Sequence, residues 1–306
     1  MLMLPWHEYQ AFPFTDGRTV RTPAAAFFSR PVIGSDAVEL PGLRTDSTSP
    51  RSAYLDRLLS RGGQLQAAGR LLAPLGVAYV VVARTTEPGG YGWLDAQRDL
   101  EVVLRTDDLV VYRNTVTGLG RVIGARTVGS LEELIDLANR GVLGSEAVLP
   151  VGAELPAGAP TPVTGDVAVV APAEPMGPQR VSPVAIDVPA GPAGWVTLPE
   201  VASDGWQVDG TPGVRTVAGT VAMPLGSAAT SVTYRPWAVL RAGYLVSAGV
   251  LVLLLVVGLV EHRADGRPAR RSRGAGVRPT RTSSVASGPE PARPPATAPA
   301  PVGSAR

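Results

Sequence analysis

Residues 242–260 read AGYLVSAGVLVLLLVVGLV, a run of nineteen positions without a charged side chain. At about 1.5 Å of rise per residue, a helix of this length covers about 30 Å, the hydrocarbon thickness of a bilayer. A buried helix of a soluble protein is the alternative, but such helices usually keep one polar face. We therefore predict a transmembrane helix over residues 240–261, with the lipid bilayer as its partner.

Charges are distributed unevenly around this run. Residues 261–306 contain nine Arg and three acidic residues, a net charge of +6, whereas the 19 Arg and 23 acids before them give −4. The arginines that follow the run closely are Arg263, Arg267, Arg270, Arg271 and Arg273. Only Arg235 and Arg241 lie close before it. Because basic residues beside a span favour the cytoplasmic side, we predict a single-pass cell-membrane protein with residues 1–236 extracytoplasmic and the C-terminus cytoplasmic.

Composition excludes several kinds of site. The 306 residues include no Cys and two His, so no disulfide, thiolate ligand or histidine-rich metal centre is expected, and no cofactor is predicted. Residues 262–306 are Arg, Pro, Ala, Ser and Gly with almost no large apolar residue, which predicts a disordered tail. That tail is interpreted as a stop-transfer signal, with contact to anionic lipid headgroups as the alternative. No basic face is indicated outside it, so no nucleic-acid partner is expected.

The start of the chain raises a question of topology. Its first ten residues, MLMLPWHEYQ, lack the charged start and the apolar stretch of a signal peptide. An outside domain must nevertheless be translocated. We therefore expect either a longer gene or upstream spans encoded separately. In both cases the chain would be the C-terminal piece of a polytopic membrane protein, with a multi-span protein as partner.

The first part of the chain predicts a small α/β domain. Residues 1–50 are rich in Pro, Gly and aromatic residues and are interpreted as an ordered loop region. From residue 51, apolar residues at helical spacing predict helices over 54–59 and 65–75. Predicted strands lie at 77–82, 100–104, 109–112 and 121–128. Ser130 and Glu133 form a capping box before a further helix that Gly141 closes, so the α/β domain is placed at 51–145.

The second part has the two-residue period of strands. Residues 146–179 are rich in Pro, Gly and Ala and are interpreted as a linker or a wrapping loop. Short apolar runs punctuated by Gly and Pro then predict an antiparallel β-sandwich at 180–236. Asp204-Gly205 and Asp209-Gly210 are expected to form hairpin turns. The predicted fold class is therefore α+β: a small α/β domain, a β-sandwich, one C-terminal transmembrane helix and a disordered tail.

Several motifs follow one another along the chain: LPW at 4–6, LLAPLGVAYVV at 71–81, LVVYRN at 109–114, GWVTLP at 194–199, DGWQVDG at 204–210 and SVTYRP at 231–236. The motifs from residue 71 onward together resemble the C-terminal end of YfhO-like bacterial membrane proteins, which are similar to multi-span GT-C glycosyltransferases. LPW resembles a motif of related actinobacterial envelope glycosyltransferases. The resemblance covers most of residues 1–262 and implies a role in assembling cell-surface polysaccharide or glycolipid. The family's catalytic spans and loop acids have no counterpart here, so no catalytic residue is carried over.

Candidate sites are few. Paired carboxylates occur at Asp107/Asp108, Glu132/Glu133 and Asp204/Asp209, but turn and cap roles account for each pair, and no catalytic residue is assigned. Trp195 and Trp206 are interpreted as core residues, with a glycan contact as the alternative.

We therefore expect a non-catalytic, membrane-anchored extracytoplasmic accessory domain of a GT-C-like envelope glycosyltransferase. It would position a glycan or polyprenyl-linked sugar. The alternative is a stand-alone scaffold or interaction module of the envelope, and a self-contained hydrolase is the least favoured interpretation.

Overall fold

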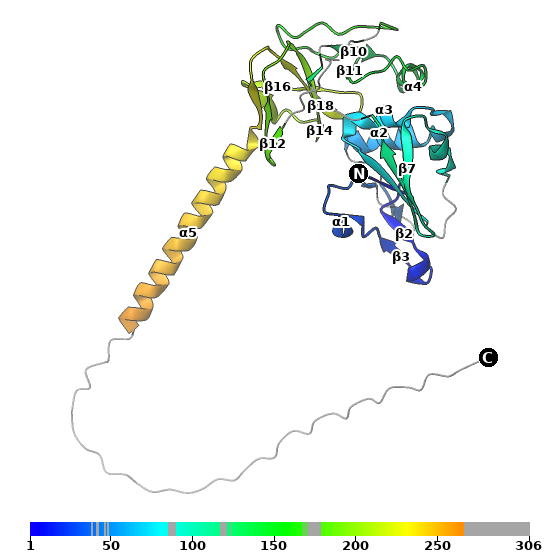
Figure 1. The fold of residues 1–306 in the computed structure, drawn as a ribbon. Coiled ribbons are helices and arrows are strands. Elements are labelled where there is room, and N and C mark those ends of the chain that lie inside the picture. The colour runs from blue at the N-terminus through cyan, green and yellow to red at the C-terminus, as the bar shows by residue number, and fades with distance from the viewer. Residues whose placement is uncertain are drawn as a thin grey trace, which may run out of the picture. The chain divides into compact units, whose positions relative to one another are not determined.

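The computed structural model describes residues 1–265, except positions 38, 41–42, 46, 48, 85–89, 117–120, 123, 168 and 170–178. Within that part the chain is a mixed α+β protein with several small sheets and one long apolar helix (Figure 1). The predicted disordered tail falls largely on residues 266–306, outside the described residues, so disorder there stays a prediction.

The first sheet has the strand order β1-β6-β8-β7. Its strands are β1 (Leu2–Leu4), β6 (Tyr79–Ala83), β8 (Leu109–Asn114) and β7 (Leu100–Arg105). β1 runs parallel to β6, and the other neighbours are antiparallel. The predicted strands at 77–82, 100–104 and 109–112 are thus confirmed to within a few residues.

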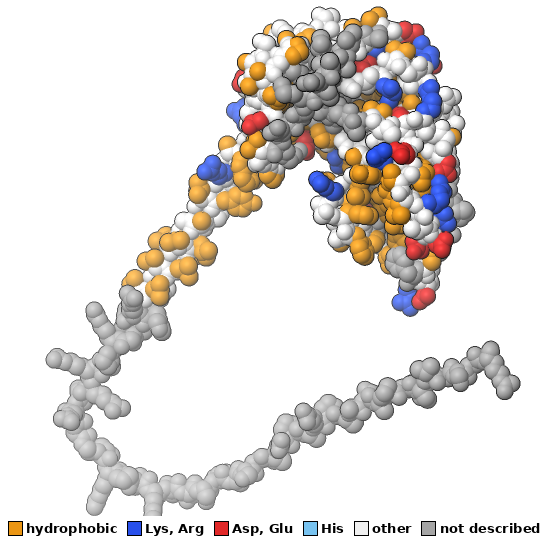
Figure 2. All heavy atoms as spheres, in the orientation of Figure 1, with side chains coloured by type: hydrophobic (Ala, Val, Ile, Leu, Met, Phe, Trp, Pro, Cys, Tyr) orange, Lys and Arg blue, Asp and Glu red, His pale blue; other side chains and the backbone are white. Residues whose placement is uncertain are grey.

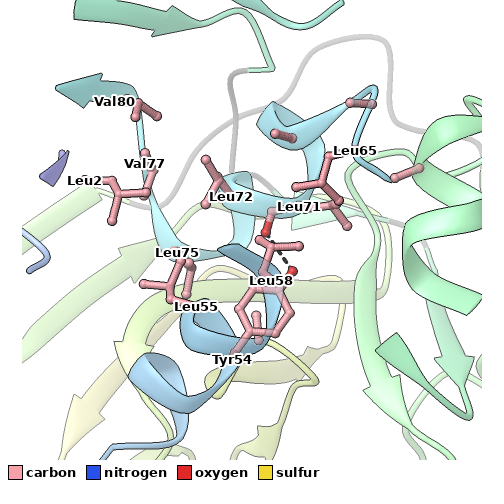
Figure 3. Close-up of a cluster of buried hydrophobic side chains, with 14 of the residues drawn as sticks. Leu2, Tyr54, Leu55, Leu58, Leu65, Leu71, Leu72, Leu75, Val77 and Val80 are labelled. Atoms are coloured by element: carbon pink, nitrogen blue, oxygen red, sulfur yellow. Dashed lines mark hydrogen bonds between the residues drawn. The ribbon is translucent and has the colours of Figure 1, made fainter. Parts of the chain in front are cut away.

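Two helices cover one face of this sheet and form the largest core with it. α2 (Pro50–Leu59) begins where the Ser49 hydroxyl accepts a hydrogen bond from the Ser52 N–H at 3.1 Å, with Pro at the first helical position. α3 (Ala68–Leu72) is shorter than the predicted helix 65–75, because a 3₁₀ turn follows it directly. Figure 3 shows leucines of both helices together with Leu2 of β1 and Val80 of β6 in this cluster, the leucine core.

The expectation of a loop over residues 1–50 is wrong at the start of the chain. β1 is fully built into the first sheet, with Leu2 and Leu4 in the leucine core and Met3 on the opposite face. The same region also holds β2 (Tyr9–Ala11), β3 (Thr19–Arg21), α1 (Ala24–Phe27), β4 (Glu39–Leu40) and β5 (Leu43–Arg44). A strand of three residues is too short to show a period. Its partner strand lies almost eighty residues away, so local patterning carries no signal for it.

Single 3₁₀ turns occupy several connections in this half of the chain. They are η1 (Pro13–Thr15), η2 (Gly62–Gln64), η3 (Ala73–Leu75) and η4 (Gly92–Ala96).

A second layer is built from a parallel strand pair and a helix. β10 (Ala125–Val128) and β11 (Ala147–Pro150) are joined through α4 (Leu131–Asn139). As predicted, the Ser130 hydroxyl accepts the Glu133 N–H, at 3.1 Å. The Glu133 carboxylate instead accepts the Gly129 N–H at 2.7 Å, so the reciprocal half of the capping box is shifted by one residue.

The segment 146–179, predicted as a linker or wrapping loop, packs against the folded part in its described residues and also contains the strand β11. Val163 forms a bridge with Arg126 of β10. The Pro160 carbonyl accepts a hydrogen bond from Trp195 Nε1 at 3.2 Å. The Pro and Gly content predicts an irregular backbone but gives no signal for β11, which pairs with β10.

Two antiparallel sheets make up the rest of the folded part. One contains β12 (Gln179–Ser182), β13 (Ala185–Val188), β19 (Thr230–Tyr234), β15 (Trp206–Val208) and β16 (Thr211–Pro212), in that order. The other contains β17 (Val214–Arg215), β18 (Thr220–Leu225), β14 (Gly194–Val201) and β9 (Arg121–Val122). The two sheets share one apolar cluster. In it, Ile186 of β13 and Val232 of β19 pack with Val196 of β14 and Met223 of β18.

The two predicted Asp-Gly turns have different outcomes. Asp209 and Gly210 both have positive φ, 48° and 80°, and join β15 to β16 as a two-residue hairpin turn. Asp204-Gly205 joins strands of different sheets instead. A Cβ on Gly205 would lie 2.5 Å from the Tyr234 ring, so close packing requires glycine there. The single strand predicted over 121–128 is instead two strands, β9 and β10, which belong to different sheets.

The long helix α5 (Pro236–Asp265) begins two residues after β19. It extends four residues beyond the predicted end at 261, so the predicted tail is helical as far as Asp265. Residues Pro236–Val260 are apolar enough and long enough to cross a membrane, and none of the most apolar window is buried. The apolar side chains along this helix are open to the surroundings in Figure 2.

Candidate functional site

The two tryptophans interpreted as core residues, with a glycan contact as the alternative, are both enclosed by the fold. Trp195 has no exposed surface and packs beside Ala125 and Leu149. Trp206 is 5% exposed, and its ring centroid lies 5.2 Å from that of Tyr234 at an angle of 52°. Since a sugar ring stacks on an open aromatic face, this burial favours core packing over a glycan contact at either ring.

The carboxylate pairs lie apart on the surface. Asp107 and Asp108 are in the exposed turn between β7 and β8. Glu132 forms an ion pair with Arg61 at 2.9 Å, while Glu133 caps α4. In the described part of the chain, no group of three His, Cys, Asp or Glu residues is arranged to hold a metal ion.

Arg126 and Glu146 form a buried ion pair that the sequence patterns do not indicate. Both side chains are fully buried, and Arg126 Nε lies 2.8 Å from Glu146 Oε1. Their remaining polar atoms bond to backbone: Arg126 donates to the carbonyls of Gly165 and Val167, and Glu146 accepts from the Gly144 N–H at 2.7 Å. With both charges satisfied internally, this pair holds segment 165–167 against β10 and has a structural role.

Two adjoining surface cavities are the best candidate for a binding site. The first, of about 330 Å³, lies among α2, the start of α4 and the turn between β17 and β18. The second, of about 650 Å³, lies between segment 150–157 and the strands around Gly210–Val214. Pro150 and Arg215 line both cavities, so the two adjoin at these residues. Volumes of this size are typical of small-molecule sites.

The turn between β17 and β18 positions Arg215 beside α2. Gly219, with φ of 73°, sits in this turn, and a Cβ there would lie 2.4 Å from the carbonyl carbon of Pro50. This close approach brings the turn against the first residues of α2, the helix that carries Arg57. The Val217 N–H donates to the Val148 carbonyl at 3.0 Å and ties the same turn to β11.

The first cavity is basic. Arg57 and Arg215 line it, none of its described lining residues is acidic, and both arginine side chains are exposed. Within the described residues, neither guanidinium has a carboxylate partner, and Arg57 Nε donates only to the Ala53 carbonyl of its own helix, at 3.2 Å.

Arg140, which lies outside the cavity, has a carboxylate partner, unlike the two cavity arginines. Its guanidinium bonds Asp166 through two nitrogens, at 2.6 and 2.8 Å. This contact lowers the pKa of the Asp166 carboxyl. A paired arginine is already occupied, whereas the two in the cavity keep donors for a ligand.

Sequence reasoning did not single out Arg57 or Arg215. Arg57 is one polar residue on an amphipathic helix, and Arg215 stands between Val214 and Thr216 in a short strand. Neither position carries a motif, and only the packing of the turn on α2 brings the two together.

Comparison of the chain with protein-family models, with curated proteins and with solved structures gives no match. The site is therefore interpreted from its own chemistry.

Proposed function

We propose that this chain is a membrane-anchored extracytoplasmic accessory module of a GT-C-like envelope glycosyltransferase, itself non-catalytic. The observation that carries the proposal is α5, a helix with an apolar segment of 25 residues, Pro236–Val260, whose most apolar window is entirely unburied. Such a surface is costly in water and is accommodated in a bilayer.

The connection between the sheet and the helix supports an anchoring role. One residue, Arg235, separates the end of β19 from the start of α5. Trp237 and Tyr244 are 41% and 67% exposed near the start of this helix. Amphipathic aromatics of this kind favour the boundary between lipid and water. The folded module would therefore be held close to the membrane surface.

The finer architecture is interpreted in the same framework. The two antiparallel sheets that share one apolar cluster are interpreted as a β-sandwich, and the first sheet with α2 and α3 as a small α/β unit. The resemblance to the C-terminal end of YfhO-like proteins supplies the link to glycosyltransferases. The cavities described above give such a module a surface on which to hold a ligand.

Cysteine labelling tests the topology directly, because the chain contains no Cys and each introduced thiol is unique. An Asp107→Cys variant places a thiol in an exposed turn of the folded part, and a Ser283→Cys variant places one after the helix. A membrane-impermeant maleimide should label the first in intact cells and the second only after permeabilisation. The opposite pattern would contradict the proposed orientation.

Expression with and without the upstream coding region separates the accessory role from a stand-alone scaffold. Co-purification of a multi-span protein encoded upstream supports the accessory role. Stable membrane insertion of this chain without such a partner favours the scaffold.

A further inference from the structure

We infer that the two adjoining cavities bind a small acidic sugar, one that carries a phosphate or carboxylate group. The oxyanion would lie between Arg57 and Arg215 in the first cavity, and the sugar hydroxyls would lie in the second. This inference names a ligand class for the accessory module and rests in that sense on the proposed function.

The positive charge of the first cavity favours a ligand with an oxyanion group. Arg57 and Arg215 are 158 positions apart in the sequence, yet they line the same space, and no other charged residue is among its described lining residues. The Glu133 carboxylate, which caps α4, accepts a hydrogen bond from the Gly129 N–H rather than from either arginine. Guanidinium groups present planar pairs of donors that match phosphate and carboxylate oxygens.

The second cavity has the complementary chemistry. Glu154 and Asp204 are exposed and line it, together with Gly210 of the hairpin turn and the residues 211–214 that follow it. Carboxylates accept hydrogen bonds from sugar hydroxyls, and they would repel a second anion. Because Arg215 lines both cavities, a ligand with an anionic end and a hydroxylated end can reach both sets of groups.

The remaining wall residues argue against a nucleotide. Among the described residues that line the two cavities none is aromatic, so a base would find no aromatic ring there to stack on. A neutral sugar could accept hydrogen bonds from the guanidinium groups but would leave both positive charges without an anionic partner. A free phosphate ion would fill only part of the first cavity, whose volume is about 330 Å³.

Calorimetric titration of the full chain in detergent micelles tests this inference. The probes are glucose 1-phosphate, glucuronate, glucose and inorganic phosphate. At least one acidic sugar should bind, glucose should not, and inorganic phosphate should bind more weakly than the acidic sugar. Failure of both acidic sugars, or equal binding of inorganic phosphate, would overturn the inference.

Matched variants assign the binding to these residues. Arg57→Gln and Arg215→Gln should each weaken binding of the acidic sugar about tenfold or more, because each removes a charged donor. Arg30→Gln, at another exposed arginine, is the control and should bind as the wild type does. Asp204→Asn should weaken binding of the sugar but not of phosphate. Equal binding by wild type and both cavity variants would show that the site lies elsewhere.

A lipid headgroup is the competing source of the same oxyanion. Vesicles of phosphatidylglycerol should not displace the acidic sugar, and displacement that Arg215→Gln abolishes would overturn the inference in favour of lipid. The outcome is independent of the cysteine labelling: sugar binding with the opposite topology would keep this inference and remove the proposed function. The proposed topology without binding of an acidic sugar would keep the proposed function and remove this inference.

Discussion

Leucines in α2 and α3 and leucines in α5 have the same side chain but opposite surroundings. The core leucines are at most 1% exposed and are Leu55, Leu58, Leu71 and Leu72. The leucines in the middle of α5 are 59–62% exposed and are Leu253, Leu254 and Leu255. The first set stabilises the fold by contacts with other parts of the chain. The second set is more than half exposed, and the proposed membrane anchor predicts that lipid covers its apolar surface.

The difference shows which surroundings stabilise each region. Removing a leucine side chain from water stabilises by about 1.5–3 kcal/mol, whether protein or lipid surrounds it. In the leucine core the cover is β1, β6 and the neighbouring helix, as Figure 3 shows. For α5, the proposed cover is lipid. Three changes test this division, from the largest expected effect to the smallest.

The largest effect is expected from charges in the middle of α5. Replacement of Leu253, Leu254 and Leu255 by Arg should abolish membrane integration, because each Arg near the centre of a span costs about 2.5–3.5 kcal/mol. Together the three changes cost on the order of 8 kcal/mol. Carbonate extraction of membranes measures the result. The same three positions changed to Ala form the control and should stay integrated, and a triple Arg variant that resists extraction would contradict the anchor.

A smaller effect is expected in the leucine core. Leu58→Ala should lower the free energy of unfolding by about 2–5 kcal/mol, because it leaves a cavity in a side-chain cluster that cannot fully collapse. Urea unfolding in detergent micelles, followed by circular dichroism, measures it. Leu254→Ala, the same chemical change on α5, should shift the urea midpoint of the folded part by little. Equal losses at both positions would remove the distinction between the two regions.

The smallest effect concerns a buried phenol in the same core. Tyr54 is 1% exposed, and its hydroxyl donates to the Leu71 carbonyl at 2.9 Å (Figure 3). Burial raises the pKa of this phenol, and the charge of Arg57 opposes the rise in part. The unfolded chain loses the tyrosine proton near pH 10, while the folded chain retains it. The free energy of unfolding therefore falls as the pH rises above about 10.

Tyr54→Phe tests that expectation. The variant should be less stable by about 1 kcal/mol at neutral pH, since it leaves the Leu71 carbonyl without its partner. Above about pH 10 its stability should fall less steeply with pH than that of the wild type. Urea titrations between neutral and alkaline pH measure both values. Tyr79→Phe, at a side chain 42% exposed, should keep the wild-type pH dependence. A parallel decline in wild type and Tyr54→Phe would show that this phenol is not protected from water.

The sequence predicted those structural elements that depend on residues adjacent along the chain. The Ser130 cap of α4 and the Asp209-Gly210 turn depend on residues within a few positions of one another, and both are present. Three strands of the first sheet, β6, β8 and β7, were predicted because their β-branched runs are long enough to show a strand pattern. The short strand β1 and the parallel strand β11 were missed, since each is stabilised by a partner distant in the sequence.

The candidate site was beyond prediction for the same reason. The preferred interpretation of Trp195 and Trp206 as core residues agrees with their burial. Arg57 and Arg215 line one cavity although they are far apart in the sequence, and Gly219 lets the turn after Arg215 approach the start of α2.

By itself, the sequence determined the long apolar helix, the excess of positive charge after it, and the turns and caps. Each of these depends on residues adjacent along the chain, and helix formation and hydrophobicity are read from such neighbours. Only the tertiary structure decided which tryptophans are buried, which strands pair and which arginines share a cavity. Those outcomes depend on side-chain packing between segments far apart in sequence, and that packing leaves no local pattern.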